Sequence, residues 1–359
     1  MDITERLNLI KEVGEEIVTE EDLKSLLEKK KKFIAYDGFE PSGTSIHIAQ
    51  GLLRAININK MIKAGAHFKI LIADWHAWAN NKMNGKLDNI QKVGKYLIEV
   101  WKACDMDLDN VEFIWASDLV KDDNYWKMVM QIARNSTVKR IVRCSQIMGR
   151  KEDEALQSSQ ILYPCMQCAD IFYLKADVCQ LGMDQRKVNV LAREIGEKLG
   201  FWKPVIVSHH MLMGLGQPPE TNMEGAERAI ELKMSKSKPD TAIFMTDSEE
   251  EIKRKIKKAY CPEGIIEDNP ILEYCKYIIF EKFDLFKIER PDKWGGNLEF
   301  KNYNELENAF EKKELHPMDL KTAAGNYLNQ LLEPVRTKLE KNKTAQRLAQ
   351  EIKGFEITR

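Results

Sequence analysis

The order of hydrophobic and polar positions along the 359-residue chain separates an alternating part from a helical part. Residues 4–30 carry apolar side chains at helical spacing and predict two short helices. Short apolar runs, typical of buried strands, then alternate with amphipathic stretches, typical of helices. The strands are predicted at 33–36, 68–73, 111–115, 177–181 and 204–208. The helices between them are predicted at 47–64, 88–104, 158–174 and 185–199.

This alternation favours an α/β fold with a doubly wound, Rossmann-like parallel sheet, because parallel neighbours need a crossover helix. A helical stretch near 124–150 interrupts the alternation as an insertion. After Pro239 the pattern is helical, with segments at 247–259, 270–283, 303–313, 318–342 and 344–353. We therefore expect a first domain over 1–240, which includes the N-terminal helices and the insertion, and an all-α domain over 241–359. Ligands of the first domain are expected at the carboxyl ends of its strands.

Composition is that of a folded protein and leaves its partner open. Hydrophobic residues make up 43% of the chain, which is enough for a substantial core. The 55 Lys and Arg residues against 56 Asp and Glu residues give 55 − 56 = −1, so a basic surface for a nucleic acid has to be local. No apolar run resembles a secretory signal or reaches about 18 residues. We expect neither export nor contact with a membrane.

Seven scattered cysteines predict reduced thiols in the cytoplasm, because an odd, unpatterned set is not a disulfide framework. Cys165 and Cys168 have the spacing of a redox or metal pair. They lie in an apolar helical stretch without a second pair, so we expect them in the core and expect no bound metal.

A turn that enters a helix directly after the first strand is the first candidate site. Residues 42–51 read Ser-Gly-Thr-Ser-Ile-His-Ile-Ala-Gln-Gly. The backbone N–H groups at such a helix start favour an anion, and His47 could add a further donor. A histidine at this position is also commonly a helix cap or a buried donor, so this motif alone is weak.

A lysine- and serine-rich segment at 233–237 is the second candidate site. It reads Lys-Met-Ser-Lys-Ser and follows residues 212–232, which we predict as a long polar loop because they are rich in Gly, Pro and Glu. Lys233 and Lys236, together with the two hydroxyls, suit a polyphosphate. The alternative for such a run is a solvated loop.

Two polar groups in otherwise apolar surroundings complete the candidate chemistry. Tyr163, Gln167 and Asp170 are spaced by four and three residues, which places them on one helix face. Buried polar groups cost about 1–3 kcal/mol each when unpaired, so these three need partners in one another or in a ligand. Asp184 follows a strand in Gly-Met-Asp-Gln and can either cap the next helix or bind a ribose diol.

These motifs together resemble a known enzyme family. His47-Ile-Ala-Gln50 resembles the "HIGH" motif, and residues 233–237 match the "KMSKS" motif of the class I aminoacyl-tRNA synthetases. The helix face of Tyr163, Gln167 and Asp170, the turn at 182–185 and Tyr36 on the first strand are similar to those of tyrosyl-tRNA synthetases, of the archaeal and eukaryotic type. The motif departs from the family pattern at Ala49 and Gln50, and glutamine, unlike histidine, cannot become cationic.

The resemblance implies a reaction and a set of site residues. Tyrosine and ATP, with Mg²⁺, would form tyrosyl-adenylate and pyrophosphate, and tyrosine would then pass to the 3′ end of tRNA(Tyr). The implied catalytic residues are His47, Gln50, Lys233 and Lys236. The implied tyrosine-binding residues are Tyr36, Ala73, His76, Tyr163, Gln167, Asp170 and Gln185. The implied ATP-binding residues are Gly38, His47, Gly51, Asp184, Lys233, Met234, Ser235, Lys236 and Ser237.

The family also implies partners for the remaining regions. Trp294, His316 and Asp319 resemble its anticodon-reading site, and the insertion near 124–150 would form a homodimer interface. A tryptophanyl-tRNA synthetase shares the fold and motifs, but Tyr36 with Asp170 suits a phenolic hydroxyl. A non-catalytic RNA-binding relative would have lost the lysines or Asp184, and a small-molecule adenylyltransferase would not need residues 240–359.

The first prediction concerns the anticodon. Tyrosine anticodons begin with guanine, whose ring N–H and amino group match the two acceptors of the Asp319 carboxylate, while Trp294 would stack on the base. We expect Asp319→Arg to weaken the preference for guanine in tRNA charging and to leave tyrosine-dependent pyrophosphate exchange nearly intact. Charging and exchange are measured on the same preparation. An unchanged preference for guanine, or a parallel loss of exchange, would mean that Asp319 only starts the long helix.

Overall fold

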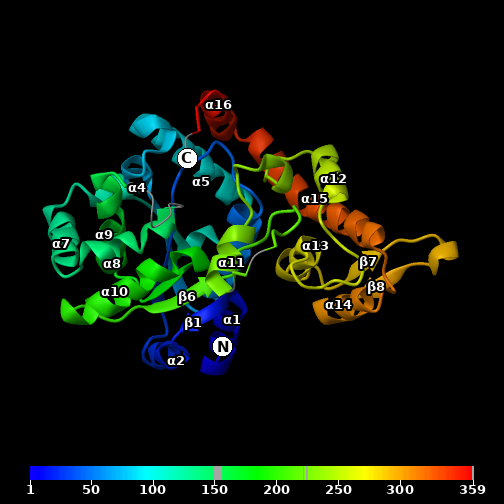
Figure 1. Ribbon diagram of the computed structural model, residues 1–359, viewed down its shortest axis with the longest axis horizontal. Helices are drawn as coiled ribbons and strands as arrows, with labels where there is room; N and C mark the ends of the chain where they lie inside the picture. Colours follow the sequence, from blue (N-terminus) through cyan, green and yellow to red (C-terminus); the bar gives the residue numbers. More distant parts are fainter. Residues whose placement is uncertain (149–155, 221, 224, 358–359) are drawn as a thin grey trace.

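A twisted sheet lies at the centre of the first part of the molecule (Figure 1). The computed structural model describes residues 1–148, 156–220, 222–223 and 225–357, and within them the sheet has six strands in the order β1-β6-β5-β2-β3-β4. The pairs are parallel except for β1 with β6, which is antiparallel. The strands are β1 Gly14–Val18, β2 Phe33–Phe39, β3 Ala66–Ile72, β4 Val111–Trp115, β5 Val178–Gly182 and β6 Val205–His209.

The five predicted parallel strands and the doubly wound fold are confirmed, whereas β1 was not predicted. This strand occupies five residues between α1 (Ile3–Val13) and α2 (Glu20–Lys29), inside the stretch predicted as two helices with no strand between them. Its sequence Gly-Glu-Glu-Ile-Val carries too little alternation to indicate a strand. It forms because the free edge of β6 supplies hydrogen-bond partners, which is information that local sequence does not contain.

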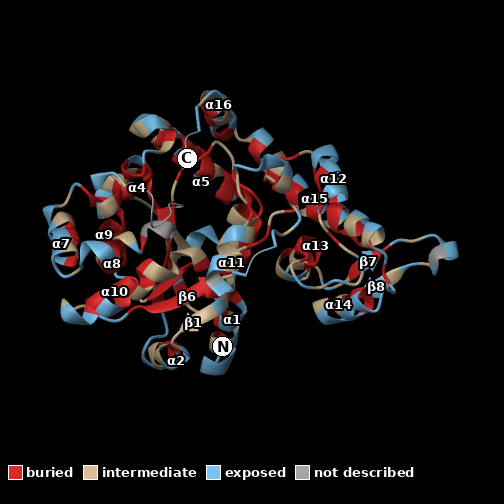
Figure 2. Ribbon diagram, in the orientation of Figure 1, coloured by how far each residue is buried: buried red, intermediate tan, exposed pale blue. Residues whose placement is uncertain are grey.

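Helices cover both faces of the sheet, and side chains of successive strand residues point to opposite layers. Phe68 and Ile70 of β3 pack in the core beneath α1, α3 (Arg54–Lys63) and α5 (Leu87–Ala103). Leu71 of β3 and Tyr36 of β2 pack on the other face, with α9 (Ser158–Tyr173) and α10 (Arg186–Lys198). Figure 2 shows the strands as a buried centre between these layers. Tyr36 is thereby directed toward α9, the helix that carries Asp170.

The insertion is helical over most of its predicted range. It contains α7 Asp123–Arg134, α8 Val138–Val142 and a short turn of helix at Ser145–Met148, and the short helix α6 Ala116–Leu119 precedes it. Both α7 and α8 pack against α9, at the left of the molecule in Figure 1. The end of the predicted insertion, residues 149–150, lies outside the described residues.

The loop predicted at 212–232 needs a correction, because α11 (Gly225–Leu232) lies within it. The Gly and Pro residues that made the segment look irregular are concentrated before residue 220. The following Ala-Glu-Arg-Ala-Ile-Glu-Leu consists mainly of good helix formers. The segment therefore delivers the lysine–serine motif directly from a helix end.

The second part of the chain is helical, as predicted. Its helices are α12 Glu249–Lys258, α13 Pro270–Tyr274 with a π-helical turn at Cys275–Ile279, α14 Tyr303–Glu311, α15 Pro317–Lys341 and α16 Lys343–Ile352. A small antiparallel pair, β7 Phe286–Ile288 with β8 Leu298–Phe300, was not predicted, since each strand has three residues. No helix among the described residues is long and apolar enough to span a bilayer.

The last two helices return to the first part of the molecule. Both α15 and α16 pack against α5, close to where Figure 1 marks the C-terminus. One continuous core cluster includes Ile48 and Trp101 of the first part as well as Ile256 and Leu320 of the second. The division of the chain near residue 240 remains a prediction, and the apolar packing continues across it.

Candidate active site

The predicted motifs meet at the carboxyl ends of β2, β3, β5 and β6, the edge of the sheet where the fold predicts a ligand. Side chains from segments that are distant in sequence contact one another there. The tyrosine-binding candidates form one group around Asp170, and the polyphosphate candidates form a second group around Asp184 and the lysine–serine segment.

The Asp170 carboxylate is completely buried and has neighbours from two other elements. The Tyr125 hydroxyl on α7 donates a 2.8 Å hydrogen bond to Oδ1. His76 on α4 (Asp74–Ala79) places Nε2 2.9 Å from Oδ2, without the alignment of a hydrogen bond. Oδ2 thus accepts no hydrogen bond from any described residue. A buried carboxylate oxygen in this condition is a site for a hydrogen-bond donor from a ligand.

Electrostatics around Asp170 fix the protonation of its neighbours. Burial raises the pKa of Tyr36 well above its usual value, and the Asp170 charge adds to this, so the phenol keeps its proton. Burial alone would lower the pKa of His76, but the Asp170 carboxylate outweighs burial and raises that pKa. Ala73, 6% exposed, lies between the end of β3 and the start of α4, and its N–H donates to the Phe39 carbonyl at 2.9 Å. The pocket therefore contains one carboxylate among groups that favour its charge.

A chain of polar side chains continues from this pocket toward solvent. The Tyr163 hydroxyl donates to Oε2 of Glu40 at 3.1 Å, and burial followed by the Glu40 charge raises the pKa of Tyr163 well above its usual value. Gln167 Nε2 donates to Gln185 Oε1 at 3.1 Å, and Gln185 Nε2 donates to the Ile147 carbonyl at 3.2 Å. The predicted helix face is thus lined by groups that are partly satisfied by one another and retain acceptors for a ligand.

The first lysine of the 233–237 segment is held by the predicted ribose-binding residue. Lys233 Nζ donates a 2.7 Å hydrogen bond to Asp184 Oδ2. Burial alone would raise the pKa of Asp184, but the Lys233 charge outweighs burial and lowers it. At Gly182 an added Cβ would lie 2.8 Å from Asp184 Oδ1 and 2.5 Å from the Met211 sulfur, so glycine leaves room for this carboxylate. Lys233 thus forms an ion pair with the carboxylate that the sequence predicts to bind a ribose.

The second lysine lies close to the end of β2 and has no hydrogen-bond partner in the part of the chain that the structure describes. Lys236 Nζ has no solvent contact and no hydrogen bond to any described residue, and lies 5.0 Å from the centre of the Phe39 ring. Burial lowers its pKa to about 7, with Glu40 opposing and Arg54 reinforcing the shift. A Cβ at Gly43 would lie 3.0 Å from Lys236 Cδ, which explains the value of a glycine in this turn. The Lys236 ammonium group is thus placed where it could bind an anion.

The "HIGH"-like segment lies near Lys236 and leads into a helix that begins with a π-helical turn. Residues Ala49–Leu53 form a π-helical turn, and His47 is paired through an isolated β-bridge to Phe244. Burial, then Lys236, lowers the pKa of His47 well below its usual value, so the imidazole is neutral and its Nδ1 has no hydrogen bond among the described residues. Gln50 Oε1 is likewise buried without a partner there. At Gly51 a Cβ would lie 2.3 Å from the Met245 sulfur, which excludes any larger residue without rearrangement.

The other predicted nucleotide-binding residues border the same edge. A Cβ at Gly38 would lie 3.0 Å from the Tyr36 hydroxyl. Met234 is buried, whereas the hydroxyls of Ser235 and Ser237 lie 2.9 Å apart and bond to each other. Neither serine contacts the Asp170 group in the structure.

Sequence analysis missed several residues of this site. Tyr125 carried no local signal, since it lies in the insertion and reaches Asp170 only through the packing of α7 on α9. Glu40 directly follows β2, and this position after a strand was a usable signal. His209 ends β6, and its Nδ1 lies 2.6 Å from Gln180 Nε2; burial, then Arg54, lowers the pKa of His209 to about 4.

The predicted anticodon residues lie apart from this site, on the second part of the chain. His316 is the N-cap of α15, and its Nδ1 accepts a hydrogen bond from the Met318 N–H at 3.2 Å, while Asp319 lies in the first turn. The side chain of Trp294 lies outside what the structure describes. Arg290 donates to the carbonyls of Gly296 and Glu314, which holds the turn after Trp294 near the start of α15.

Comparison with known proteins was made against this geometry. The family model described as tRNA synthetases class I (W and Y) matches residues 28–333. The chain is 52% identical to a cytoplasmic tyrosine–tRNA ligase of Arabidopsis thaliana over 361 residues, which cover 100% of this chain and 90% of the relative.

Two solved structures are similar over nearly the whole chain. A Pyrococcus horikoshii tyrosyl-tRNA synthetase complexed with L-tyrosine has a TM-score of 0.90 at 39% identity, covering 98% of this chain and 100% of that chain. A Leishmania major tyrosyl-tRNA synthetase complexed with tyrosinol has a TM-score of 0.89 at 43% identity and covers 99% of this chain. This chain spans only 53% of the Leishmania chain.

The second prediction follows from the lowered pKa of Lys236. Above pH 7 this lysine is largely neutral in the free protein, and a bound polyphosphate would raise its pKa by replacing burial with an ion pair. ATP binding at pH 8 should therefore take up about 0.5–1 proton. This uptake should disappear at pH 6, where Lys236 is already protonated. Titration calorimetry in two buffers of different ionisation enthalpy measures it, and Lys236→Met, which cannot take up a proton, is the control. Equal proton uptake by Lys236→Met and the unaltered protein would contradict the assignment.

Proposed function

The chain belongs to the tyrosine–tRNA ligases among the class I tRNA synthetases, and we propose that Tyr36 and Asp170 select the tyrosine that it activates. The enzyme joins tyrosine to ATP, releases pyrophosphate and transfers the tyrosyl group to the 3′ end of tRNA. The observation that supports the residue assignment best is the buried Oδ2 of Asp170, which accepts no hydrogen bond from the described residues. The phenolic hydroxyl of tyrosine is the donor that this atom lacks.

Selection of the phenol uses two complementary groups. The substrate hydroxyl donates to the Asp170 carboxylate, and Tyr36, whose raised pKa keeps it protonated, donates to the phenolic oxygen. Phenylalanine would leave Oδ2 of Asp170 and the Tyr36 hydroxyl without these two hydrogen bonds, which costs binding free energy that no apolar contact returns. His76 supports the arrangement from beside Asp170.

The ammonium group of the bound tyrosine would donate hydrogen bonds to side-chain oxygens of α9. Gln167 donates its amide N–H to Gln185, which leaves its own Oε1 directed to accept from the substrate ammonium. The Tyr163 hydroxyl donates to Glu40 and offers its oxygen lone pairs to the same ammonium. Ala73 contributes a small apolar wall, where a larger side chain would reduce the space for the substrate.

Adenylation is a displacement at the α-phosphate of ATP. A carboxylate oxygen of tyrosine forms the new bond to phosphorus, and the bond from phosphorus to the bridging oxygen of the β-phosphate breaks. Lys233 and Lys236 neutralise the charge of the departing pyrophosphate. Lys233 exchanges Asp184 for phosphate, which frees Asp184 to accept from the ribose hydroxyls. His47 and Gln50 act as neutral donors, and Mg²⁺ enters with ATP as part of the substrate.

The helical second part binds the anticodon in this proposal, and transfer to tRNA occurs in the cytoplasm, where the Arabidopsis relative is named as residing. Recognition of a loop base by Trp294, His316 and Asp319 is supported by the Arg290 contacts that hold the two segments together. A single-stranded base that stacks on an aromatic ring gains about 1–3 kcal/mol.

A homodimer through the insertion is supported by apolar side chains that remain exposed at that end of the molecule. Met130 of α7 is 59% exposed and Val138 of α8 is 66% exposed, while Trp78 and Leu162 of the neighbouring helices are also exposed. Large apolar side chains gathered on adjoining helices are typical of a protein interface. A second copy of the chain is the proposed occupant.

The third prediction tests the function and its selecting carboxylate. Pyrophosphate exchange with each of the twenty amino acids should be supported by tyrosine alone. Asp170→Ala should lower kcat/KM for tyrosine by about 100-fold or more, since a buried hydrogen bond to a charged group is lost. Activity with phenylalanine should change little, because phenylalanine never uses that carboxylate.

Asp170→Asn and Tyr125→Phe are the controls. The asparagine keeps the shape of the pocket but removes the charge, and it should also lose selectivity. Tyr125→Phe removes a hydrogen bond only from Oδ1 and should cost less than about tenfold. If tyrosine and phenylalanine activities fall by the same factor in both Asp170 variants, Asp170 does not select the hydroxyl.

The fourth prediction concerns assembly. Sedimentation at micromolar concentration should give about twice the 41.6 kDa of one chain. A charge in the interface opposes its burial, so Met130→Glu combined with Val138→Glu should shift the protein toward the monomer. The matched control is Met223→Glu with Ile265→Glu, which replaces exposed apolar residues away from the insertion and should leave the dimer intact. A monomer for the unaltered chain would rule out the proposed interface.

A further inference from the structure

The position of Lys233 depends on a short pairing between two connecting segments. Met213 and Lys233 form an isolated antiparallel bridge. The Met234 N–H donates to the Leu212 carbonyl at 2.7 Å, and the Gly214 N–H donates to the Leu232 carbonyl at 2.9 Å. The segment 210–214, which continues from β6, therefore acts as a template for the backbone of Lys233.

Helix α13 of the second part binds this template directly. Glu273 Oε2 accepts from the Met213 N–H at 2.8 Å, and the Tyr274 hydroxyl donates to the Met213 carbonyl at 2.7 Å. Both polar backbone groups of the residue opposite Lys233 are thus bound by α13. The start of α13 is itself fixed, because the buried Asn269 side chain accepts from the N–H groups of Ile271 and Leu272.

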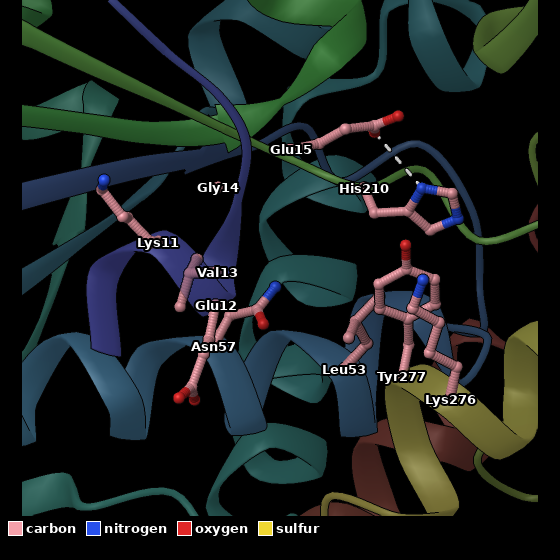
Figure 3. Close-up of a pocket in the computed structure, with 10 residues that line it drawn as sticks. All are labelled: Lys11, Glu12, Val13, Gly14, Glu15, Leu53, Asn57, His210, Lys276 and Tyr277. Carbon is pink, nitrogen blue, oxygen red and sulfur yellow. Dashed lines mark hydrogen bonds and ion pairs between the residues drawn. The ribbon is translucent and has the colours of Figure 1, made fainter. Parts of the chain in front are cut away.

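The same glutamate also holds the beginning of the template through His210. Glu273 Oε1 lies 2.9 Å from His210 Nε2, and Glu15 Oε2 of β1 lies 3.2 Å from Nδ1. The imidazole stacks on Tyr277 with ring centres 4.2 Å apart, beside a pocket of about 230 Å³ (Figure 3). Burial alone would lower the pKa of His210, but the two carboxylates outweigh it and raise that pKa to about 9. A cationic His210 is clamped between two carboxylates at neutral pH.

We propose that Glu273 is a positioning residue for tyrosine activation, which sets the place of Lys233 by holding Met213 and His210. Glu273 touches neither substrate in the proposed site and acts through the backbone pairing of 212–214 with 232–234. A small displacement of a charged group relative to the departing pyrophosphate is enough to reduce a rate, because its interaction with the transition state depends on distance. The inference rests on the proposed function, since it assigns Lys233 to ATP.

The chain offers a matched control in Glu281. This residue lies beyond the end of α13, whereas Glu273 lies within that helix. It likewise joins the two parts of the molecule, through a 2.7 Å ion pair from Lys60 Nζ on α3. Among the described residues it forms no hydrogen bond or ion pair with residues 210–214. A variant of Glu281 therefore removes a comparable bridge between the two parts but leaves the template for Lys233 intact.

The experiment measures tyrosine-dependent pyrophosphate exchange in the full chain. Glu273→Ala should lower kcat by about 10- to 100-fold, with KM for tyrosine within twofold of the unaltered enzyme. The kcat of Glu273→Gln should lie between those of Glu273→Ala and the unaltered enzyme. Its amide oxygen can still accept a hydrogen bond from the Met213 N–H, but the negative charge that pairs with His210 is lost. Glu281→Ala should keep kcat within twofold. Thermal melting of all variants accompanies the rates.

A double-mutant cycle separates positioning from general stabilisation. If Glu273 acts through Lys233, the enzyme with both Lys233→Ala and Glu273→Ala should lose no more single-turnover rate than Lys233→Ala alone. Rate losses that multiply in the double variant would overturn the inference. So would a normal kcat in Glu273→Ala and Glu273→Gln, or a loss equal to that of Glu281→Ala. Absence of tyrosine-dependent exchange in the unaltered enzyme would instead refute the proposed function.

Discussion

The buried carboxylate of Asp170 is the interaction on which the amino-acid pocket depends. Removing such a charge from water costs on the order of several kcal/mol unless neighbouring groups compensate. Compensation comes from two other elements, through the hydrogen bond from Tyr125 on α7 and the ion pair with His76 on α4. The insertion therefore has to pack on α9 for this charge to be tolerated. The packing of the insertion on α9 and the proposed selection of tyrosine therefore both depend on the Asp170 carboxylate.

The proposed nucleotide-binding side of the site has more positively charged side chains than carboxylates to pair with them. Lys233 is satisfied by Asp184, whereas Lys236 is withdrawn from water and has no hydrogen bond among the described residues. Burial and the nearby Arg54 lower the pKa of Lys236, and the same positive surroundings keep His47 neutral. An anion that enters this region restores the charge of Lys236 and competes for Lys233. In the proposed function, the polyphosphate of ATP is the anion that supplies this missing charge.

The sequence carried the parts of this design that are local. The alternation of apolar runs predicted the parallel strands, and the spacing of Tyr163, Gln167 and Asp170 predicted one face of α9, which the structure confirms. It did not predict β1, which exists because β6 has a free edge, or the role of Tyr125, which depends on the packing of a helix 45 residues away in sequence. Nor could it predict that His47 is neutral, since that follows from burial against a segment near residue 244. The omissions share one cause, namely contacts between residues that are distant in the chain.

The contacts of the second part with the first follow from where the core lies. The apolar cluster beneath α3 and α5 continues through Ile256 and Leu320 into the helical part, so the two parts are not joined by a polar linker alone. Separating them would expose part of this core, at a cost of about 25 cal/mol for each square ångström of apolar surface. A polar contact placed on such a rigid base keeps its geometry, and the hydrogen bonds of Glu273 and Tyr274 to Met213 are placed in this way. In the proposed function, the helical part therefore helps to position Lys233 through fixed geometry, independently of any contact that it makes with RNA.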